Sequence, residues 1–135
     1  MTNERLIEEA KKARENAYTP YSKFKVGCAI LLKDGKVVYG ANVENASYPV
    51  TNCAERSALF AAYSQGYRED DIVKMAVVGD TEDFIAPCGA CRQVISELVS
   101  NETEIILANL KGAVKVVNKH DLLPFSFTKK DLGKE

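Results

Sequence analysis

The sequence predicts an α/β fold, a three-layer α/β/α sandwich built on a five-stranded mixed sheet, and three observations support it. Short apolar runs typical of strands lie at residues 25–32, 37–41, 72–79, 104–108 and 114–117. Segments with helical spacing lie between the later runs, at residues 54–65 and 89–99. Helices between strands that do not form hairpins imply crossover connections, which are almost always right-handed. The predicted sheet is therefore a hairpin extended by parallel strands, with helices on both faces.

The first predicted element is a helix near the N-terminus. Apolar residues recur there at helical spacing, at Leu6, Ala10, Ala13 and Ala17. Thr2 or Asn3 can cap the start of the helix, because either side chain can accept a hydrogen bond from a free backbone N–H group. The helix should stop before Thr19-Pro20, because the residue before a proline disfavours helical backbone.

Turn residues mark the boundaries of the later elements. Asp34-Gly35 separates the strands predicted at 25–32 and 37–41, and this dipeptide between apolar runs indicates a β-hairpin. An irregular polar stretch follows from residue 42 to 52. Gly66 is a natural C-terminal stop for the helix at 54–65, and a short helix is expected near residues 129–132.

Size and charge restrict the possible classes of protein. A chain of 135 residues is expected to form one domain, residues 1–135, because two cores would each be marginal in size. Lysine and arginine number 18 and aspartate and glutamate 19, a net charge of −1. Nucleic-acid binding usually needs a basic excess, so a nucleic-acid partner is not expected. Hydrophobic residues at 46% and charged residues at 27% favour a folded domain over a disordered chain.

The expected location is the cytoplasm. The charged N-terminal segment, which includes Glu4, Arg5 and Glu8, is unlike a secretory signal peptide. The longest apolar run, from Val26 to Leu32, is too short to cross a bilayer, so no membrane partner is expected.

Four cysteines carry the chemical signal, at Cys28, Cys53, Cys88 and Cys91. The cytoplasm keeps thiols reduced, so these residues are core residues, metal ligands or reactive groups rather than disulfides. Cys28 lies within an apolar run and is expected to be a buried strand residue. Cys88 and Cys91 are three residues apart in the first turn of a predicted helix, so both can reach one ion.

The remaining cysteine, Cys53, also opens a predicted helix. Helix N-termini favour negative charge and lower the pKa of thiols, and three thiolates that converge need a cation. Zn²⁺ takes four ligands, and catalytic sites leave the fourth position to water. The single histidine, His120, lies in a polar stretch and is expected at the surface. An open, water-bearing zinc site is therefore favoured over a closed structural one.

Glu55 is the candidate base for the bound water, because it is the only carboxylate within a few residues of these cysteines. Residues two apart on a helix point about 200° apart, so Cys53 must occupy a cap position for both side chains to face the ion. Arg56 and Arg92 are candidates to donate hydrogen bonds to thiolate sulfur, which would offset the net negative charge of the site.

A redox function is the alternative explanation for Pro87-Cys88-Gly89-Ala90-Cys91. A C-x-x-C pair by itself is equally compatible with metal binding and with thiol chemistry. Adding Cys53 and Glu55 favours metal, because a redox pair has no use for that element. A thiol oxidoreductase would retain its activity after Cys53→Ala, and a non-catalytic zinc module would have no need of Glu55.

The two elements Cys53-Ala54-Glu55 and Pro87-Cys88-Gly89-Ala90-Cys91 together resemble the zinc nucleobase and nucleoside deaminases. A cysteine as the first ligand resembles the small, homotetrameric cytidine deaminases. The resemblance extends to three further segments: Tyr21-Ser22-Lys23-Phe24-Lys25-Val26-Gly27, Asn42-Val43-Glu44-Asn45-Ala46-Ser47-Tyr48, and Leu122-Leu123-Pro124-Phe125.

This resemblance implies a role for each matching residue. Cys53, Cys88 and Cys91 would hold one zinc ion per subunit, with Arg56 donating to their thiolates and Glu55 shuttling protons. The implied nucleoside contacts are Phe24 on the pyrimidine, the Ala54 amide on the base carbonyl, and Asn42 and Glu44 on the ribose hydroxyls. Phe125 would cover the base from a neighbouring subunit of a homotetramer, with Tyr48 near that boundary. Without the resemblance, the phenylalanines would be read as core aromatics, Asn42 and Glu44 as strand-end polar residues, and Tyr48 as a turn residue.

The implied activity is hydrolytic deamination of cytidine and 2′-deoxycytidine to uridine and 2′-deoxyuridine, in pyrimidine salvage. Zinc lowers the pKa of its water towards about 7, and the resulting hydroxide attacks C4 while Glu55 moves the protons. A deaminase of another aminopyrimidine, such as blasticidin S, shares the cysteine pattern and stays open. A polynucleotide editor is disfavoured by the net charge of −1, although a chain with this net charge can still carry a local basic patch.

Overall fold

The computed structural model describes residues 1–134 and contains one sheet in the order β2-β1-β3-β4-β5. The strands are β1 (Val26–Leu32), β2 (Val37–Ala41), β3 (Ile72–Gly79), β4 (Glu104–Asn109) and β5 (Val114–Val117). The helices are α1 (Asn3–Arg14), α2 (Ala54–Ser64), α3 (Gly89–Leu98) and α4 (Lys119–Leu122). Short 3₁₀ turns lie at Tyr48–Val50, Glu69–Asp71 and Lys129–Leu132.

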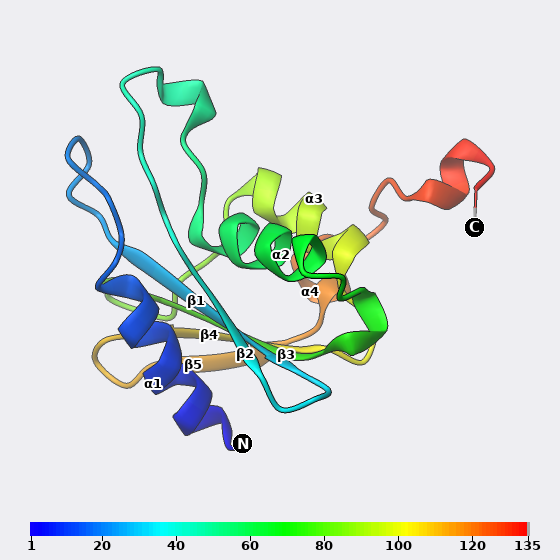
Figure 1. Ribbon diagram of the computed structural model, residues 1–135, viewed down its shortest axis with the longest axis horizontal. Helices are drawn as coiled ribbons and strands as arrows, with labels where there is room; N and C mark the ends of the chain where they lie inside the picture. Colours follow the sequence, from blue (N-terminus) through cyan, green and yellow to red (C-terminus); the bar gives the residue numbers. More distant parts are fainter. Residues whose placement is uncertain (135) are drawn as a thin grey trace.

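The strands β2, β3 and β4 run in the same direction, so their carboxyl ends lie together at one end of the sheet. β1 pairs antiparallel with both β2 and β3, while β3 and β4 are parallel. The carboxyl ends of β2, β3 and β4 therefore point the same way, and α2 and α3 each begin beyond that end (Figure 1). Such an end is where open α/β sheets place their ligands.

The predicted mixed sheet is confirmed, but the expected extension of the hairpin by parallel strands holds for β3 and β4 alone. β3 pairs antiparallel with β1, and β5 pairs antiparallel with β4. The helix α2 carries the chain across β1, so that β3 pairs with the edge of β1 that faces away from β2. Among the five described strands, β3 and β4, joined through α3, are the one parallel pair.

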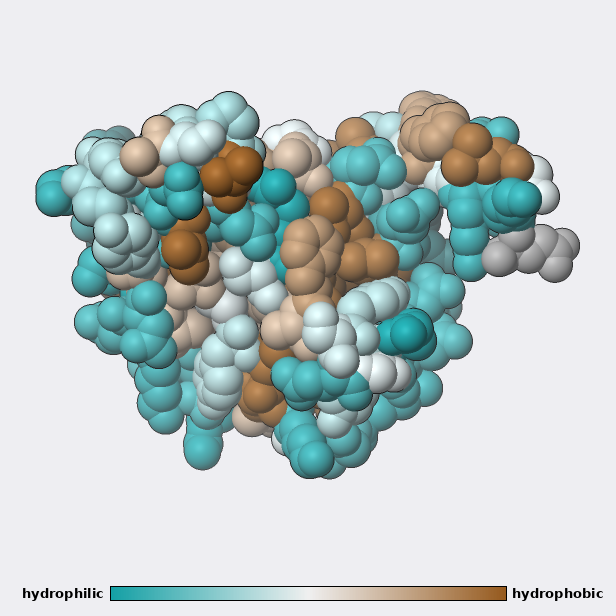
Figure 2. Space-filling view, turned by 45° about the horizontal axis from the view of Figure 1, so that its top comes forward, coloured by the Kyte–Doolittle hydropathy of each residue, from teal (hydrophilic) through white to brown (hydrophobic). Residues whose placement is uncertain are grey.

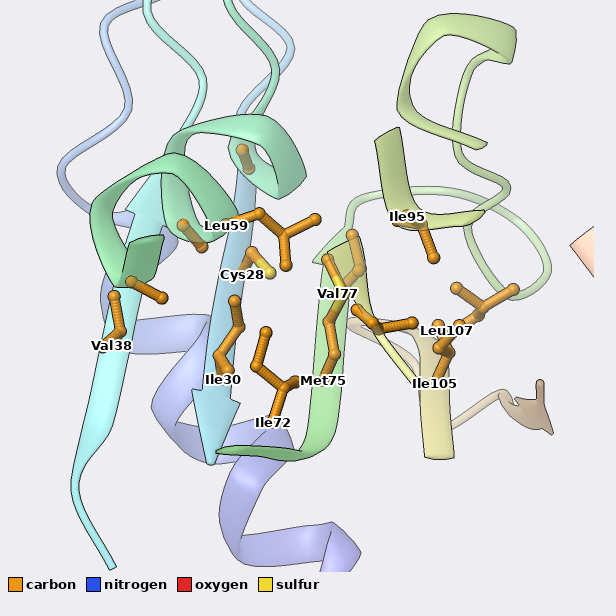
Figure 3. Close-up of a cluster of buried hydrophobic side chains, with 14 of the residues drawn as sticks. Cys28, Ile30, Val38, Leu59, Ile72, Met75, Val77, Ile95, Ile105 and Leu107 are labelled. Carbon is orange, nitrogen blue, oxygen red and sulfur yellow. The ribbon is translucent and has the colours of Figure 1, made fainter. Parts of the chain in front are cut away.

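Helices cover both faces of the sheet, as predicted (Figure 1). On one face, α2 and α3 pack on large apolar side chains that include Ile30, Met75, Val77 and Ile105 (Figure 3). The other face carries small residues under α1, at Ala29, Ala76 and Ala108, together with Val78 and Ile106. β1 is buried from both sides, which explains why it reads as an unbroken apolar run. Cys28 lies wholly buried in the larger cluster, as expected.

The local signals explain most element boundaries. The Thr2 side chain caps α1 by accepting a hydrogen bond from the Arg5 amide at 3.1 Å. Gly35, with φ of +88°, makes the hairpin turn that Asp34-Gly35 predicts. Gly66, with φ of +97°, lies just beyond the end of α2. The helix α1 ends at Arg14, earlier than the expected inclusion of Ala17, because the chain turns there and Tyr18 bridges to Val43.

The C-terminal segment extends away from the rest of the molecule (Figure 1). It carries the exposed apolar side chains Phe125, Phe127 and Leu132. Within residues 1–134, no helix is both long and apolar enough to cross a membrane.

Candidate active site

Two helix starts meet at the carboxyl edge of the sheet, and a cysteine occupies the cap of each. Cys53 caps α2 with φ −77° and ψ 158°, and Cys88 caps α3 with φ −68° and ψ 166°. Neither side chain makes a capping hydrogen bond to the backbone of the helix that it precedes, so both thiols can face another group. Because Cys53 occupies the cap position with extended backbone, its side chain and that of Glu55 can face the same side, and both residues line one cavity.

The three predicted ligand sulfurs lie together. The Sγ atoms of Cys53, Cys88 and Cys91 are all within 4.8 Å of one another, and those of Cys53 and Cys88 are 3.8 Å apart. Zn–S bonds of about 2.3 Å at tetrahedral angles place two sulfurs about 3.8 Å apart. The cluster therefore fits one zinc ion, with Cys91 buried, Cys53 half-buried and Cys88 exposed. In the described part of the chain, this is the one group of three or more such residues close enough to share an ion.

Arg56 lies against this cluster and supplies positive charge. Its guanidinium donates a hydrogen bond to the Cys53 sulfur at 3.3 Å. Hydrogen bonds from Cys91, Arg56 and Cys88 lower the pKa of Cys53 to about 5, whereas its partner Cys91 has its pKa raised. Thiolate at Cys53 is thus favoured at neutral pH, which is the form that binds a metal.

Glu55 is buried beside the thiols, with only 4% of its surface exposed. Burial raises the pKa of its carboxyl group to about 7, because the charged form loses its hydration. A carboxyl group with a pKa near neutral can both accept and donate a proton at the pH of the cell.

A cavity of about 290 Å³ opens at these residues. The predicted residues that line it are Phe24, Asn42, Cys53, Ala54, Glu55 and Cys88. Its walls are mostly apolar with a few polar groups, as is typical of sites for small molecules. Figure 2 brings this end of the molecule forward and shows apolar surface patches set among hydrophilic side chains.

Four further lining residues are absent from the predicted set: Val26, Thr81, Ile85 and Ala86. Three of them lie in the loop between β3 and α3. Their position in a loop after a strand could have indicated that they lie near the site, but their residue types carry no distinctive chemistry. Asn109, at the end of β4, holds this loop by donating to the carbonyl oxygens of Thr81 at 2.9 Å and Glu82 at 3.1 Å.

Three of the predicted nucleoside contacts do not line this cavity. Glu44 is buried and accepts hydrogen bonds from the backbone amides of Tyr21 and Ser22, both at 3.0 Å. Tyr48 is 58% exposed, and Phe125 is completely exposed. Their proposed roles stay predictions.

Arg92 does not act as the sequence suggested. Its Nε donates to the Pro87 carbonyl at 2.9 Å, and its Nη1 donates to the Leu122 carbonyl at 3.0 Å. Arg92 therefore fixes the backbone just before Cys88 instead of donating to a thiolate. His120 lies at the surface as expected, 2.9 Å from the Asn101 side chain.

The α/β/α fold and the three-cysteine cluster together define a zinc-binding enzyme site, and comparison with known proteins assigns the family. The model of the cytidine and deoxycytidylate deaminase zinc-binding region matches residues 1–107, and the chain belongs to this family. A cytidine deaminase of Halalkalibacterium halodurans is 54% identical over 98% of this chain and 99% of the relative. One from Sporosarcina psychrophila is 52% identical over 98% and 96%, respectively.

Solved structures agree with this assignment. The crystal structure of cytidine deaminase from Burkholderia pseudomallei has a TM-score of 0.92 at 57% identity, covering 94% of this chain and 100% of the other. That of the Mycobacterium tuberculosis cytidine deaminase has a TM-score of 0.77 at 38% identity, covering 94% and 98%.

Proposed function

We propose that this protein catalyses the zinc-dependent hydrolytic deamination of cytidine and 2′-deoxycytidine. Water is consumed, the exocyclic amine leaves as ammonia, and uridine or 2′-deoxyuridine is formed. The observation that carries the proposal is the buried Glu55 carboxyl group beside three thiols spaced for one zinc ion, in a cavity large enough for a pyrimidine.

The chain's own residues supply the proton transfers. Zinc held by Cys53, Cys88 and Cys91 supplies, when bound, a water acidic enough to act as a nucleophile at neutral pH. Glu55 accepts a proton from that water and delivers it to ring N3, which makes C4 electrophilic. After water oxygen has added to C4, Glu55 transfers the second proton to the amine, and the C4–N bond breaks. One carboxyl group serves as base and then acid because its pKa lies near 7.

The cavity walls support the proposed orientation of the nucleoside. Phe24 offers an aromatic face to the pyrimidine. Asn42 uses one donor and one acceptor within the protein, bonding Phe24 O at 2.8 Å and Val26 N at 2.9 Å, so its second N–H can meet a ribose hydroxyl. Ala54 is the first residue of α2, where backbone amides have no partner within the helix and can reach the base carbonyl.

The test is incubation of the purified protein with cytidine, following the loss of cytidine absorbance and the release of ammonia. We expect turnover that stops with a strong zinc chelator and returns when zinc, but not magnesium, is restored. Turnover that persists in zinc-free protein would contradict the proposal. Parallel assays with deoxycytidine and blasticidin S measure the substrate range.

We also propose that the protein assembles as a homotetramer with active sites shared between subunits. Phe125 is completely exposed, with a left-handed backbone at φ of +53°, on the segment that extends from the molecule (Figure 1). Its apolar ring has no cover from its own subunit, which supports a role over a neighbour's base. The exposed Tyr48 supports the same boundary.

Mixing two variants tests the sharing of sites. Glu55→Gln and Phe125→Ala should each be weakly active alone. Unfolded and refolded together, they should recover activity, because some sites combine Glu55 of one subunit with Phe125 of another. A monomeric mass by sedimentation, or no recovery in a verified mixed assembly, would contradict the proposal.

We propose that this reaction belongs to pyrimidine salvage in the cytoplasm. All four cysteines are free thiols, and the proposed metal site needs three of them reduced.

A further inference from the structure

The segment between α1 and β1 is held by one buried carboxylate. Oε1 of Glu44 accepts the backbone amides of Tyr21 and Ser22, both at 3.0 Å. Oε2 of Glu44 accepts the Ser22 hydroxyl. These bonds, the Ser22 hydroxyl foremost, hold the pKa of Glu44 below its usual value, so the carboxylate is charged at neutral pH. With three donors on one carboxylate, both the Glu44 side chain and the backbone at Tyr21 and Ser22 have little freedom to move.

The Ser22 hydroxyl has a second contact, on the other side. Its oxygen accepts the backbone N–H of Phe24 at 3.0 Å. The intervening residue, Lys23, has a left-handed backbone with φ of +61°, which an ordinary side chain adopts only when its surroundings enforce it. The bond across Lys23 closes this tight turn and fixes the direction in which Phe24 leaves it.

The fixed residue is a wall of the active-site cavity. The Phe24 ring lines the cavity and lies over Gly79, with its Cζ 3.4 Å from the point that a β-carbon there would occupy. Phe24 is held at its carbonyl as well, by Asn42 at 2.8 Å. Both residues proposed to bind the ribose, Asn42 and Glu44, are therefore joined to the backbone of the residue proposed to contact the base.

We infer that Ser22 is a positioning residue, whose hydroxyl joins Glu44 to the backbone of Phe24 and thereby sets the affinity for the nucleoside. The inference rests on the proposed function. Without the hydroxyl, Oε2 of Glu44 loses its donor and the Phe24 amide loses its acceptor. The aromatic wall and the ribose-binding carboxylate then move independently, and the cavity is less preorganised. Glu55 and the thiols have no contact with Ser22 in this arrangement, so the chemical step should proceed as before.

The test is steady-state kinetics with cytidine for Ser22→Ala, Ser22→Thr and the control Ser64→Ala. We expect Ser22→Ala to raise KM about fivefold to tenfold, the equivalent of roughly one hydrogen bond, with kcat within about twofold of wild type. Ser22→Thr retains the hydroxyl and should restore most of the affinity. Ser64 is an exposed residue at the end of α2, and its variant should match wild type.

Two outcomes would overturn the inference. One is an unchanged KM in Ser22→Ala, and the other is a fall in kcat that accounts for the whole loss of kcat/KM. A double-mutant cycle adds a check, since Ser22→Ala and Glu44→Gln should be less than additive in KM if they act through one contact.

A measurement without substrate separates this inference from the proposed function. In wild type the Phe24 amide should be protected from hydrogen exchange, and in Ser22→Ala it should exchange faster, while zinc content and melting temperature stay close to wild type. A wild-type protein that does not deaminate cytidine would contradict the proposed function. Unchanged exchange at Phe24 would overturn the role of Ser22 whatever the activity.

Discussion

Cys53 shows how one backbone conformation decides what two side chains can do. On a continuous helix, residues 53 and 55 would point in different directions. As the cap of α2, Cys53 has extended backbone, and it lines one cavity with Glu55. The motif in the sequence specifies the residue types, and the helix boundary supplies the geometry.

Glu55→Gln tests the role of the carboxyl group in proton transfer. Glutamine has nearly the same shape and leaves the cavity lining unchanged, but it cannot accept and return a proton. We expect kcat to fall by about 10² to 10⁴, while metal analysis still finds about one zinc per chain. The measurement is cytidine turnover on zinc-loaded protein, with zinc content measured on the same sample.

Glu97→Gln is the matched control, because Glu97 is an exposed carboxylate on α3. It should retain wild-type turnover. Substantial activity in zinc-replete Glu55→Gln would refute the proton-shuttle assignment.

Residue types with distinctive chemistry could be located from the sequence, whereas ordinary wall residues could not. Cysteine spacing and an adjacent glutamate were enough to find Cys53, Glu55, Cys88 and Cys91. Thr81, Ile85 and Ala86 line the cavity only because the β3–α3 loop folds over it. Arg92 was misassigned because spacing near a cysteine does not reveal which carbonyls a guanidinium reaches.

At the level of elements, the site depends on how closely α2 approaches β2. Gly40 lies beneath the start of α2, where a β-carbon would be 2.5 Å from both the Ala54 carbonyl oxygen and the Ala58 amide nitrogen. Backbone atoms cannot move aside as a flexible side chain would. The absence of a side chain at Gly40 therefore allows the helix that carries Cys53 and Glu55 to sit against the sheet.

Gly40→Ala should displace the start of α2 and destabilise the protein. We expect the free energy of unfolding to fall by roughly 1–3 kcal/mol, as for other overpacked interiors, and zinc to be lost at lower chelator concentrations. The measurements are denaturant unfolding and chelator titration.

Gly89→Ala provides the contrast, because nothing lies within 4 Å of its added β-carbon. Its stability should equal or exceed that of wild type, since alanine favours helical backbone. Equal stability of the two variants would contradict the close-approach argument.

The order of strands was harder to predict than the strands themselves. Periodicity and turn residues located β1, β2 and β3, because those signals are local. The antiparallel pairing of β3 with β1 is set by the path of α2 over the hairpin, which no local pattern encodes. The short helix α4 also lacked a periodic signal; its start depends on the Asn118 side chain, which accepts from the His120 amide at 2.9 Å.

For the molecule as a whole, the proposed metal site is a crosslink between α2 and α3. Its ligands come from the starts of two helices that follow different strands. An ion that binds only the folded chain stabilises it in proportion to the logarithm of its concentration over its dissociation constant. Zinc should therefore stabilise the fold as well as supply the chemistry.

Removing zinc should lower the melting temperature. A free zinc concentration about a thousandfold above its dissociation constant is worth about 4 kcal/mol of unfolding free energy. Calorimetry with and without chelator measures the difference, and a single transition would also support the prediction of one domain. Cys88→Ala should melt like the chelated protein and respond little to further chelator; a large remaining response would place the stabilising ion elsewhere.

The unequal exposure of the three thiols has a consequence for metal exchange. Cys91 is sealed in the interior, while Cys88 is open to solvent and borders the cavity. A competing chelator must therefore approach through the same opening as the nucleoside. A bound nucleoside would block this route, so the rate at which a chelator removes zinc should fall as the nucleoside concentration rises.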